Sequence, residues 1–130
     1  KINLTNLNIF SRSKLVNTNW SQGIKANIFD IVTSNPPYID NKYIKNLPKE
    51  IKEYEPLIAL KGGKNGLDSF KSLLPIVRTV MKVNALLALE IGFDQSKLLE
   101  NILYKNKFKL KDIIKDISGN KRIMIAISIQ

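Results

Sequence analysis

The 130-residue sequence contains neither cysteine nor histidine. The absence of cysteine excludes disulfides, thiolate metal sites and cysteine nucleophiles. The absence of histidine excludes imidazole acid–base catalysis and the usual zinc sites. We therefore expect a protein that binds no metal and whose chemistry needs no histidine.

Long apolar runs are also missing. The stretch Ala85–Leu89 is a typical one, and it is far shorter than the roughly 20 apolar residues that a helix needs to cross a bilayer. The first residues do not resemble a signal peptide. We therefore expect a cytoplasmic protein with no membrane partner.

Arginine is scarce although the chain is strongly basic. The sequence has 21 basic and 11 acidic residues, a net charge of +10, and its arginines are Arg12, Arg78 and Arg122. A basic surface can attract nucleic acid. However, the lysines are spread along the chain, and Lys, Ile and Asn are abundant together, as in the product of an AT-rich gene. We interpret the charge as coding bias and solvated lysines, and we expect no direct nucleic-acid substrate.

The apolar pattern predicts a single α/β domain. The length suits one domain with a real core. The near-continuous apolar run 28–34 predicts a strand covered on both faces of a parallel sheet. Further predicted elements are strands at 14–17, 85–91, 108–115 and 122–129, helices at 67–83 (bent or locally irregular at Pro75) and 94–105 (with Asp94 as N-cap), and short helical turns at 43–47 and 50–54 within the long loop 39–66. This order predicts a sheet that is parallel at first and closes with a hairpin.

The most informative junction is Asn35-Pro36-Pro37-Tyr38, directly behind the strand predicted at 28–34. The Asn35 amide can accept and donate hydrogen bonds, and Pro36 has no N–H, so its backbone offers only a carbonyl acceptor. Pro37 holds the residue before it in an extended conformation. Ligands in open α/β sheets bind beyond the carboxyl ends of the strands. Two acceptors with the Tyr38 ring beside them suit a planar –NH2 group, and indicate methylation of an amide or amino nitrogen of adenine, guanine or glutamine.

Two carboxylates outside this corner could be read as catalytic groups. We interpret Glu55 instead as ordering the loop near the pocket, and Glu90, at the end of a strand, as making a structural hydrogen bond. We expect Arg122 and Asp116 to form a pair that stabilises a turn.

Several further segments extend the pattern of the corner. They are Tyr54-Glu55-Pro56, Ala59-Leu60, Gly62-Gly63, Gly66-Leu67, Leu89-Glu90-Ile91-Gly92 with Gln95 just behind, and the ending from Lys115 to Arg122. Together with the corner, they resemble the C-terminal two-thirds of the methyltransferase domain of the peptide-chain release factor glutamine methyltransferases. The resemblance covers essentially the whole chain. It implies a Rossmann-like class I methyltransferase sheet, mostly parallel with a C-terminal antiparallel hairpin.

The resemblance also implies a cofactor, a partner and residue roles. The cofactor is S-adenosylmethionine, and the partner is a release factor whose Gly-Gly-Gln tip carries the target glutamine. Asn35 and Pro36 are then the catalytic residues that hold the glutamine amide, while Pro37 and Tyr38 wall the pocket. Asn19, Trp20 and Asn35 would contact the cofactor. Asn19 replaces a family aspartate and can accept a hydrogen bond without charge, whereas Trp20 has the equal alternative of an ordinary, partly buried aromatic residue.

The chain departs from the family pattern in one large respect. It has no glycine-rich loop after a first strand and no acidic residue placed for a ribose. We therefore interpret residues 1–130 as a partial methyltransferase catalytic domain that lacks its first strands and the N-terminal helical domain: an excerpt, a truncated gene product or one piece of a split protein. An exposed sheet edge at 28–34 would then favour self-association.

Three other functions remain open at this point. A nucleic-acid amino-methyltransferase or a ribosomal-protein glutamine methyltransferase could use the same Asn-Pro-Pro-Tyr corner. The chain could also be a truncated remnant without catalytic activity.

Overall fold

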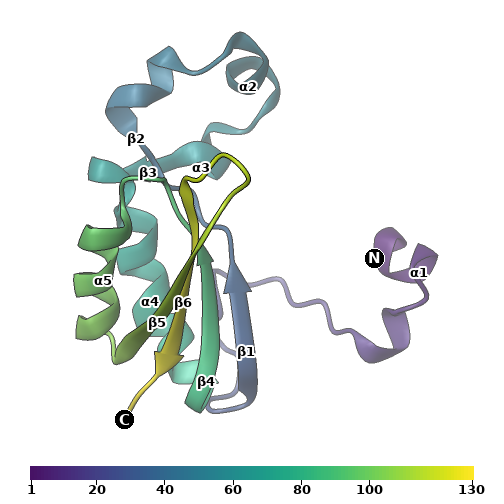
Figure 1. The fold of residues 1–130 in the computed structure, drawn as a ribbon. Helices are drawn as coiled ribbons and strands as arrows, with labels where there is room; N and C mark the ends of the chain where they lie inside the picture. Colours follow the sequence, from purple (N-terminus) through teal and green to yellow (C-terminus); the bar gives the residue numbers. More distant parts are fainter.

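The computed structural model describes residues 1–130, and its main sheet has the strand order β1-β4-β6-β5 (Figure 1). β1 (Phe29–Ser34) and β4 (Met81–Glu90) are parallel. β6 (Lys121–Ser128) pairs antiparallel with β4 on one side and with β5 (Phe108–Lys115) on the other. The predicted α/β class, with its closing antiparallel hairpin, is confirmed.

Two amphipathic helices cover one face of this sheet. They are α4 (Asp68–Val80) and α5 (Ser96–Lys105), which lie side by side against the strands in Figure 1. Apolar residues spaced three and four apart put one stripe of each helix into the core. The fully buried side chains of this core include Phe70, Leu74, Leu87, Leu89, Leu99, Leu103, Phe108 and Met124. α4 continues through Pro75.

The segment between β1 and α4 lies beyond the carboxyl ends of β1 and β4 (Figure 1). Its elements are β2 (Ile39–Asp40), η2 (Asn41–Asn46), α2 (Lys49–Tyr54), α3 (Leu57–Leu60), β3 (Lys61–Gly63) and η3 (Lys64–Gly66). The two predicted helical turns are η2 and α2. β2 and β3 form an additional parallel pair, which folds the long connection back over the end of the sheet.

The N-terminal region stands apart from the sheet in Figure 1. It contains α1 (Ile2–Asn6) and η1 (Phe10–Arg12). The strand predicted at 14–17 is wrong, because these residues are irregular and exposed. Two adjacent apolar residues do not make a strand when no neighbouring strand takes up their backbone hydrogen bonds.

The prediction that the strand at 28–34 is covered on both faces is wrong. β1 is the first strand in the sheet order and pairs only with β4, and Ile31 in its middle is 63% exposed. An apolar run indicates that a strand can be buried on both faces. Whether the strand is buried depends on which elements lie beside it.

The start of α5 also differs from the prediction. The helix begins at Ser96 and its N-cap is Gln95, which makes no side-chain capping bond. Asp94 is therefore not the N-cap. The Gln95 amide is engaged elsewhere, as described below. None of the helices is long and apolar enough to span a bilayer.

Candidate functional site

The Asn35-Pro36-Pro37-Tyr38 corner lies where β1 ends, at the carboxyl edge of the parallel pair. Pro36 is fully buried, whereas Asn35 is exposed. Pro37 and Tyr38 are half-buried. The buried proline thus anchors the corner in the core, while the Asn35 carboxamide stays accessible to a ligand.

The Tyr38 side chain is fixed from the end of β4. Its hydroxyl donates a hydrogen bond of 2.8 Å to Oε1 of Glu90. Burial, and then this hydrogen bond to a carboxylate, raise the pKa of Tyr38. The structural hydrogen bond predicted for Glu90 is therefore confirmed, and it ties the corner to the neighbouring strand.

The predicted turn pair of Asp116 and Arg122 is confirmed beside this contact. Arg122 Nη2 lies 3.1 Å from Asp116 Oδ2. Asp116 Oδ1 also accepts the backbone N–H groups of Ser118 and Asn120, at 3.0 and 2.9 Å. The pKa of Asp116 is held below its ordinary value, mainly by the hydrogen bond from the Asn120 N–H and also by the Arg122 guanidinium. The hydrogen bond to Asp116 in turn raises the pKa of Arg122.

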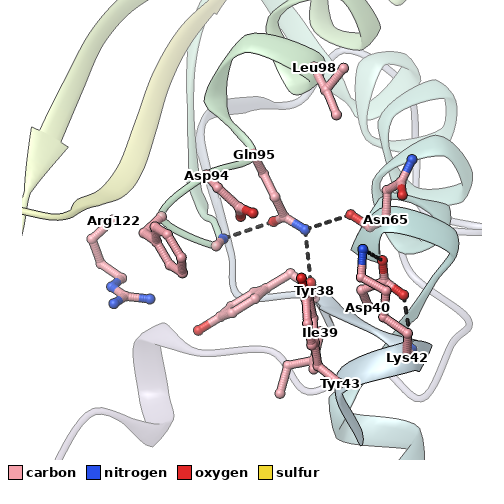
Figure 2. Close-up of a pocket in the computed structure, with 12 residues that line it drawn as sticks. Tyr38, Ile39, Asp40, Lys42, Tyr43, Asn65, Asp94, Gln95, Leu98 and Arg122 are labelled. Atoms are coloured by element: carbon pink, nitrogen blue, oxygen red, sulfur yellow. Dashed lines mark hydrogen bonds and ion pairs between the residues drawn. The ribbon is translucent and has the colours of Figure 1, made fainter.

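A buried glutamine joins the corner to two other loops. Gln95 is only 6% exposed. Its Nε2 donates to the carbonyls of Tyr38 and Asn65 at 2.9 and 3.0 Å (Figure 2) and to the Gly66 carbonyl at 3.3 Å. Its Oε1 accepts the Gly92 N–H at 2.8 Å. One amide thus fixes the exit of the corner, the turn at η3 and the end of β4. The sequence pattern includes Gln95 in the family resemblance but predicts no role for it. The spacing Gly92-x-x-Gln95 after a strand is the signal that could have identified this clamp.

Two glycines allow the segment 61–66 to pass close to the corner. A Cβ added at Gly62 would lie 2.7 Å from the Tyr38 Cα. One added at Gly66, where φ is +66°, would collide with the Tyr38 carbonyl and with the Gln95 amide. These close approaches explain why glycine occupies these two positions.

A cavity of about 630 Å³ opens beside Tyr38 (Figure 2). Its lining includes Tyr38, Tyr43, Phe93, Asp94 and Leu98. Asn35, Pro36 and Pro37 do not line it. Tyr38 is therefore the residue that the predicted amide site and this cavity share, and Phe93 and Asp94 are lining residues for which the sequence gave no site role.

The residues predicted to contact a cofactor come from two segments. Trp20 is half-buried and, like Tyr38, packs against the main core cluster, whereas Asn19 is exposed. Next to Trp20, the hydroxyl of Ser21 is buried without a hydrogen-bond partner. The packing of Trp20 agrees with its alternative as a core aromatic, and the cofactor contact stays a prediction.

Glu55, which we interpreted as ordering the loop near the pocket, is not part of the cavity beside Tyr38. It is exposed.

Comparisons with known proteins agree with the predicted resemblance. No family model matches the chain. The release factor glutamine methyltransferase of Clostridium acetobutylicum is 37% identical over 129 residues, which are 98% of this chain and 45% of that protein. The protein of the same name from Caulobacter vibrioides is 35% identical over 125 residues, 96% of this chain and 43% of its own length. The chain thus spans less than half the length of these curated relatives.

A solved structure is similar in fold. It is a candidate DNA modification methylase from Thermus thermophilus, with a TM-score of 0.53 and 15% identity over 83% of this chain and 49% of that one. At this identity the likeness supports the fold alone, and it agrees with a class I methyltransferase sheet. By sequence, the chain is a relative of the release factor glutamine methyltransferases that corresponds to their C-terminal part.

Proposed function

We propose that this chain is the C-terminal part of a methyltransferase catalytic domain that methylates the side-chain amide nitrogen of the glutamine in the Gly-Gly-Gln motif of a release factor. The observation that carries the proposal is the match of 35–37% identity, over nearly the whole chain, to proteins named release factor glutamine methyltransferases. The exposed Asn35 carboxamide at the carboxyl end of β1 supports it.

An amide nitrogen is a poor nucleophile because its lone pair is delocalised into the carbonyl. The main task of the site is therefore to position the nitrogen, and good positioning contributes about 7–11 kcal/mol in favourable cases. We propose that the Asn35 side-chain oxygen and the Pro36 carbonyl accept the two N–H donors of the glutamine. Because both acceptors carry partial negative charge, they also favour the positive charge that develops on the nitrogen.

The cofactor of this reaction would be S-adenosylmethionine, which supplies a methyl group on a sulfonium. The chain has side chains of types that could contact this cofactor: an accessible carboxamide at Asn35, a half-buried indole at Trp20 and a hydroxyl without a hydrogen-bond partner at Ser21. We propose that Trp20 packs on the cofactor, that Asn19 accepts a hydrogen bond from an amino group, and that Asn35 faces both the cofactor and the substrate.

The replacement Asn35→Ala tests the amide site. In the gene product that contains this chain, we expect methyl transfer to a purified release factor to fall at least about 100-fold, because one of two aligned acceptors is lost. Binding of S-adenosylmethionine, measured by calorimetric titration, should fall much less. Asn101→Ala, at an exposed position of α5, is the matched control. Unchanged methyl transfer by Asn35→Ala would refute the assignment.

Calorimetric titration of the 130-residue chain with S-adenosylmethionine addresses a second question. Tight binding would show that the residues of this chain suffice for the cofactor. Absence of binding, together with activity of a longer gene product, would show that further segments complete the site. Absence of both would favour the alternative of a non-catalytic remnant.

A further inference from the structure

We infer that the cavity beside Tyr38 binds a short peptide segment in which a basic side chain stands next to an apolar one, and that this segment flanks the target glutamine. The inference rests on the proposed function and names the part of the protein substrate that this cavity contacts. Tyr38 gives the physical connection, because it belongs to the amide-binding corner and also lines the cavity. A peptide whose glutamine reaches Asn35 would therefore pass the cavity with its neighbouring residues.

The first argument is the apolar surface that the cavity exposes. Phe93 is 64% exposed, Tyr43 51% and Leu98 49%. These side chains come from three separate elements, the β4–α5 connection, η2 and α5, and they line one concave surface. Exposed apolar groups gathered in a hollow are typical of a binding site. The volume of about 630 Å³ lies within the usual range of ligand pockets and suits a few peptide side chains.

The second argument is the distribution of charge around the cavity. Both of its lining cations have an acidic partner: Lys42 lies 3.3 Å from Asp40, and Arg122 lies 3.1 Å from Asp116. Asp94 is exposed on the cavity wall and takes part in none of the ion pairs of the chain. Asp94 is thus the one charged group of the lining without an ion-pair partner, and its carboxylate can pair with a cation of a ligand but would repel a phosphate placed next to it. The charge therefore favours a basic peptide over a nucleic acid.

Peptide binding to the 130-residue chain, measured by isothermal titration calorimetry, tests the inference. Two short synthetic peptides contain Gly-Gly-Gln and carry a Leu-Arg pair on its N-terminal or on its C-terminal side, and the tighter binder becomes the probe. We expect Asp94→Asn to weaken binding of the probe about two- to fivefold, as for an exposed ion pair. We expect Phe93→Ala to weaken it about fivefold or more, as for an aromatic anchor.

Matched variants separate the cavity from general effects. Glu100→Gln removes the same charge from an exposed position of α5 outside this cavity, and Tyr104→Ala removes another exposed aromatic ring. Both should bind the probe like the unchanged chain. Asp94→Lys should weaken binding of the probe further. This variant should instead bind more tightly a peptide in which glutamate replaces the arginine. Because Phe93 and Asp94 are exposed, their variants should keep the fold, which circular dichroism checks.

A further peptide distinguishes this inference from the proposed function. When alanine replaces the glutamine of the probe, binding should still respond to Asp94→Asn and should no longer respond to Asn35→Ala. The inference is overturned if neither peptide binds, or if binding ignores both cavity variants, whatever the methylation assay shows. If the cavity variants weaken binding while Asn35→Ala leaves methyl transfer unchanged, the proposed function fails and the peptide site stands.

Discussion

At the scale of single residues, two carboxylates near the corner, Glu90 and Asp116, fix the positions of other side chains. Glu90 accepts the Tyr38 hydroxyl, and Asp116 holds Arg122 together with the backbone of the β5–β6 turn. Because the proposed reaction needs aligned acceptors more than a general base, carboxylates near the corner can serve to fix its geometry.

The role of Asp116 gives a pH-dependent prediction. Its pKa in the folded protein is depressed, so its contribution to stability is present above the unfolded pKa, which is about 3.9, and is lost as the pH falls through the folded value. Asp40 and Asp68 have depressed pKa values as well. We therefore expect the Tm to fall below about pH 4, and to fall less steeply for Asp116→Asn than for the unchanged chain.

Thermal unfolding followed by circular dichroism between neutral and acid pH measures this difference. Asp112→Asn, which changes an exposed carboxylate of β5 outside the ion pairs of the chain, is the control. Parallel curves for Asp116→Asn and the unchanged chain would show that the turn pair contributes no pH-dependent stability.

At the scale of elements, the clamp made by Gln95 links three segments that are far apart in the sequence. Replacing it by methionine keeps the approximate volume but removes the hydrogen bonds to Tyr38, Gly66 and Gly92. At about 0.5–1.5 kcal/mol for each net hydrogen bond, and with buried carbonyls left without a donor, we expect Gln95→Met to reduce the free energy of unfolding by about 2–4 kcal/mol.

Urea denaturation provides the measurement for this variant, and Gln22→Met, at an exposed loop position, is its control. Hydrogen exchange of the Gly92 amide adds a local readout, because this N–H loses its acceptor. If stability and exchange both stay unchanged, Gln95 does not clamp these segments.

Local sequence patterns predicted the elements whose neighbours are close in the chain. The hairpin strand β5 matches its predicted range 108–115, and the periodic stripe placed α4 within 67–83. The burial of β1 could not be predicted in this way, because it depends on which strand lies beside it. The N-cap of α5 was missed for a similar reason: the Gln95 side chain bonds to carbonyls some 30 and 57 residues away, and nothing in the local spacing of α5 reveals these partners.

For the candidate site too, the sequence predicted only the part whose residues are adjacent in the chain. The corner at 35–38 could be identified because its chemistry is contiguous in the sequence. The cavity beside it could not, because Tyr43, Phe93 and Leu98 come together only when η2 folds over the end of the sheet.

At the scale of the whole molecule, the free edge of β1 is the main feature without a partner. β1 pairs on one side with β4, and nothing in the chain pairs with its other side. Ile31 presents an apolar side chain in the middle of this strand. An unpaired, apolar edge is a template for another strand, whereas the net charge of +10 opposes close approach of two copies. Because salt screens this repulsion, we propose that self-association of the 130-residue chain strengthens as salt increases.

Sedimentation velocity at several protein and salt concentrations tests this proposal through Ile31→Lys, which places a charge on the edge in the way that natural edge strands avoid pairing. We expect the unchanged chain to sediment faster as salt and concentration rise, and Ile31→Lys to stay monomeric. Ile117→Lys makes the same change at a fully exposed position of the β5–β6 turn and should behave like the unchanged chain. Equal loss of association in both variants would assign the effect to net charge, and a monomer under all conditions would show that the edge of β1 does not pair with a second copy.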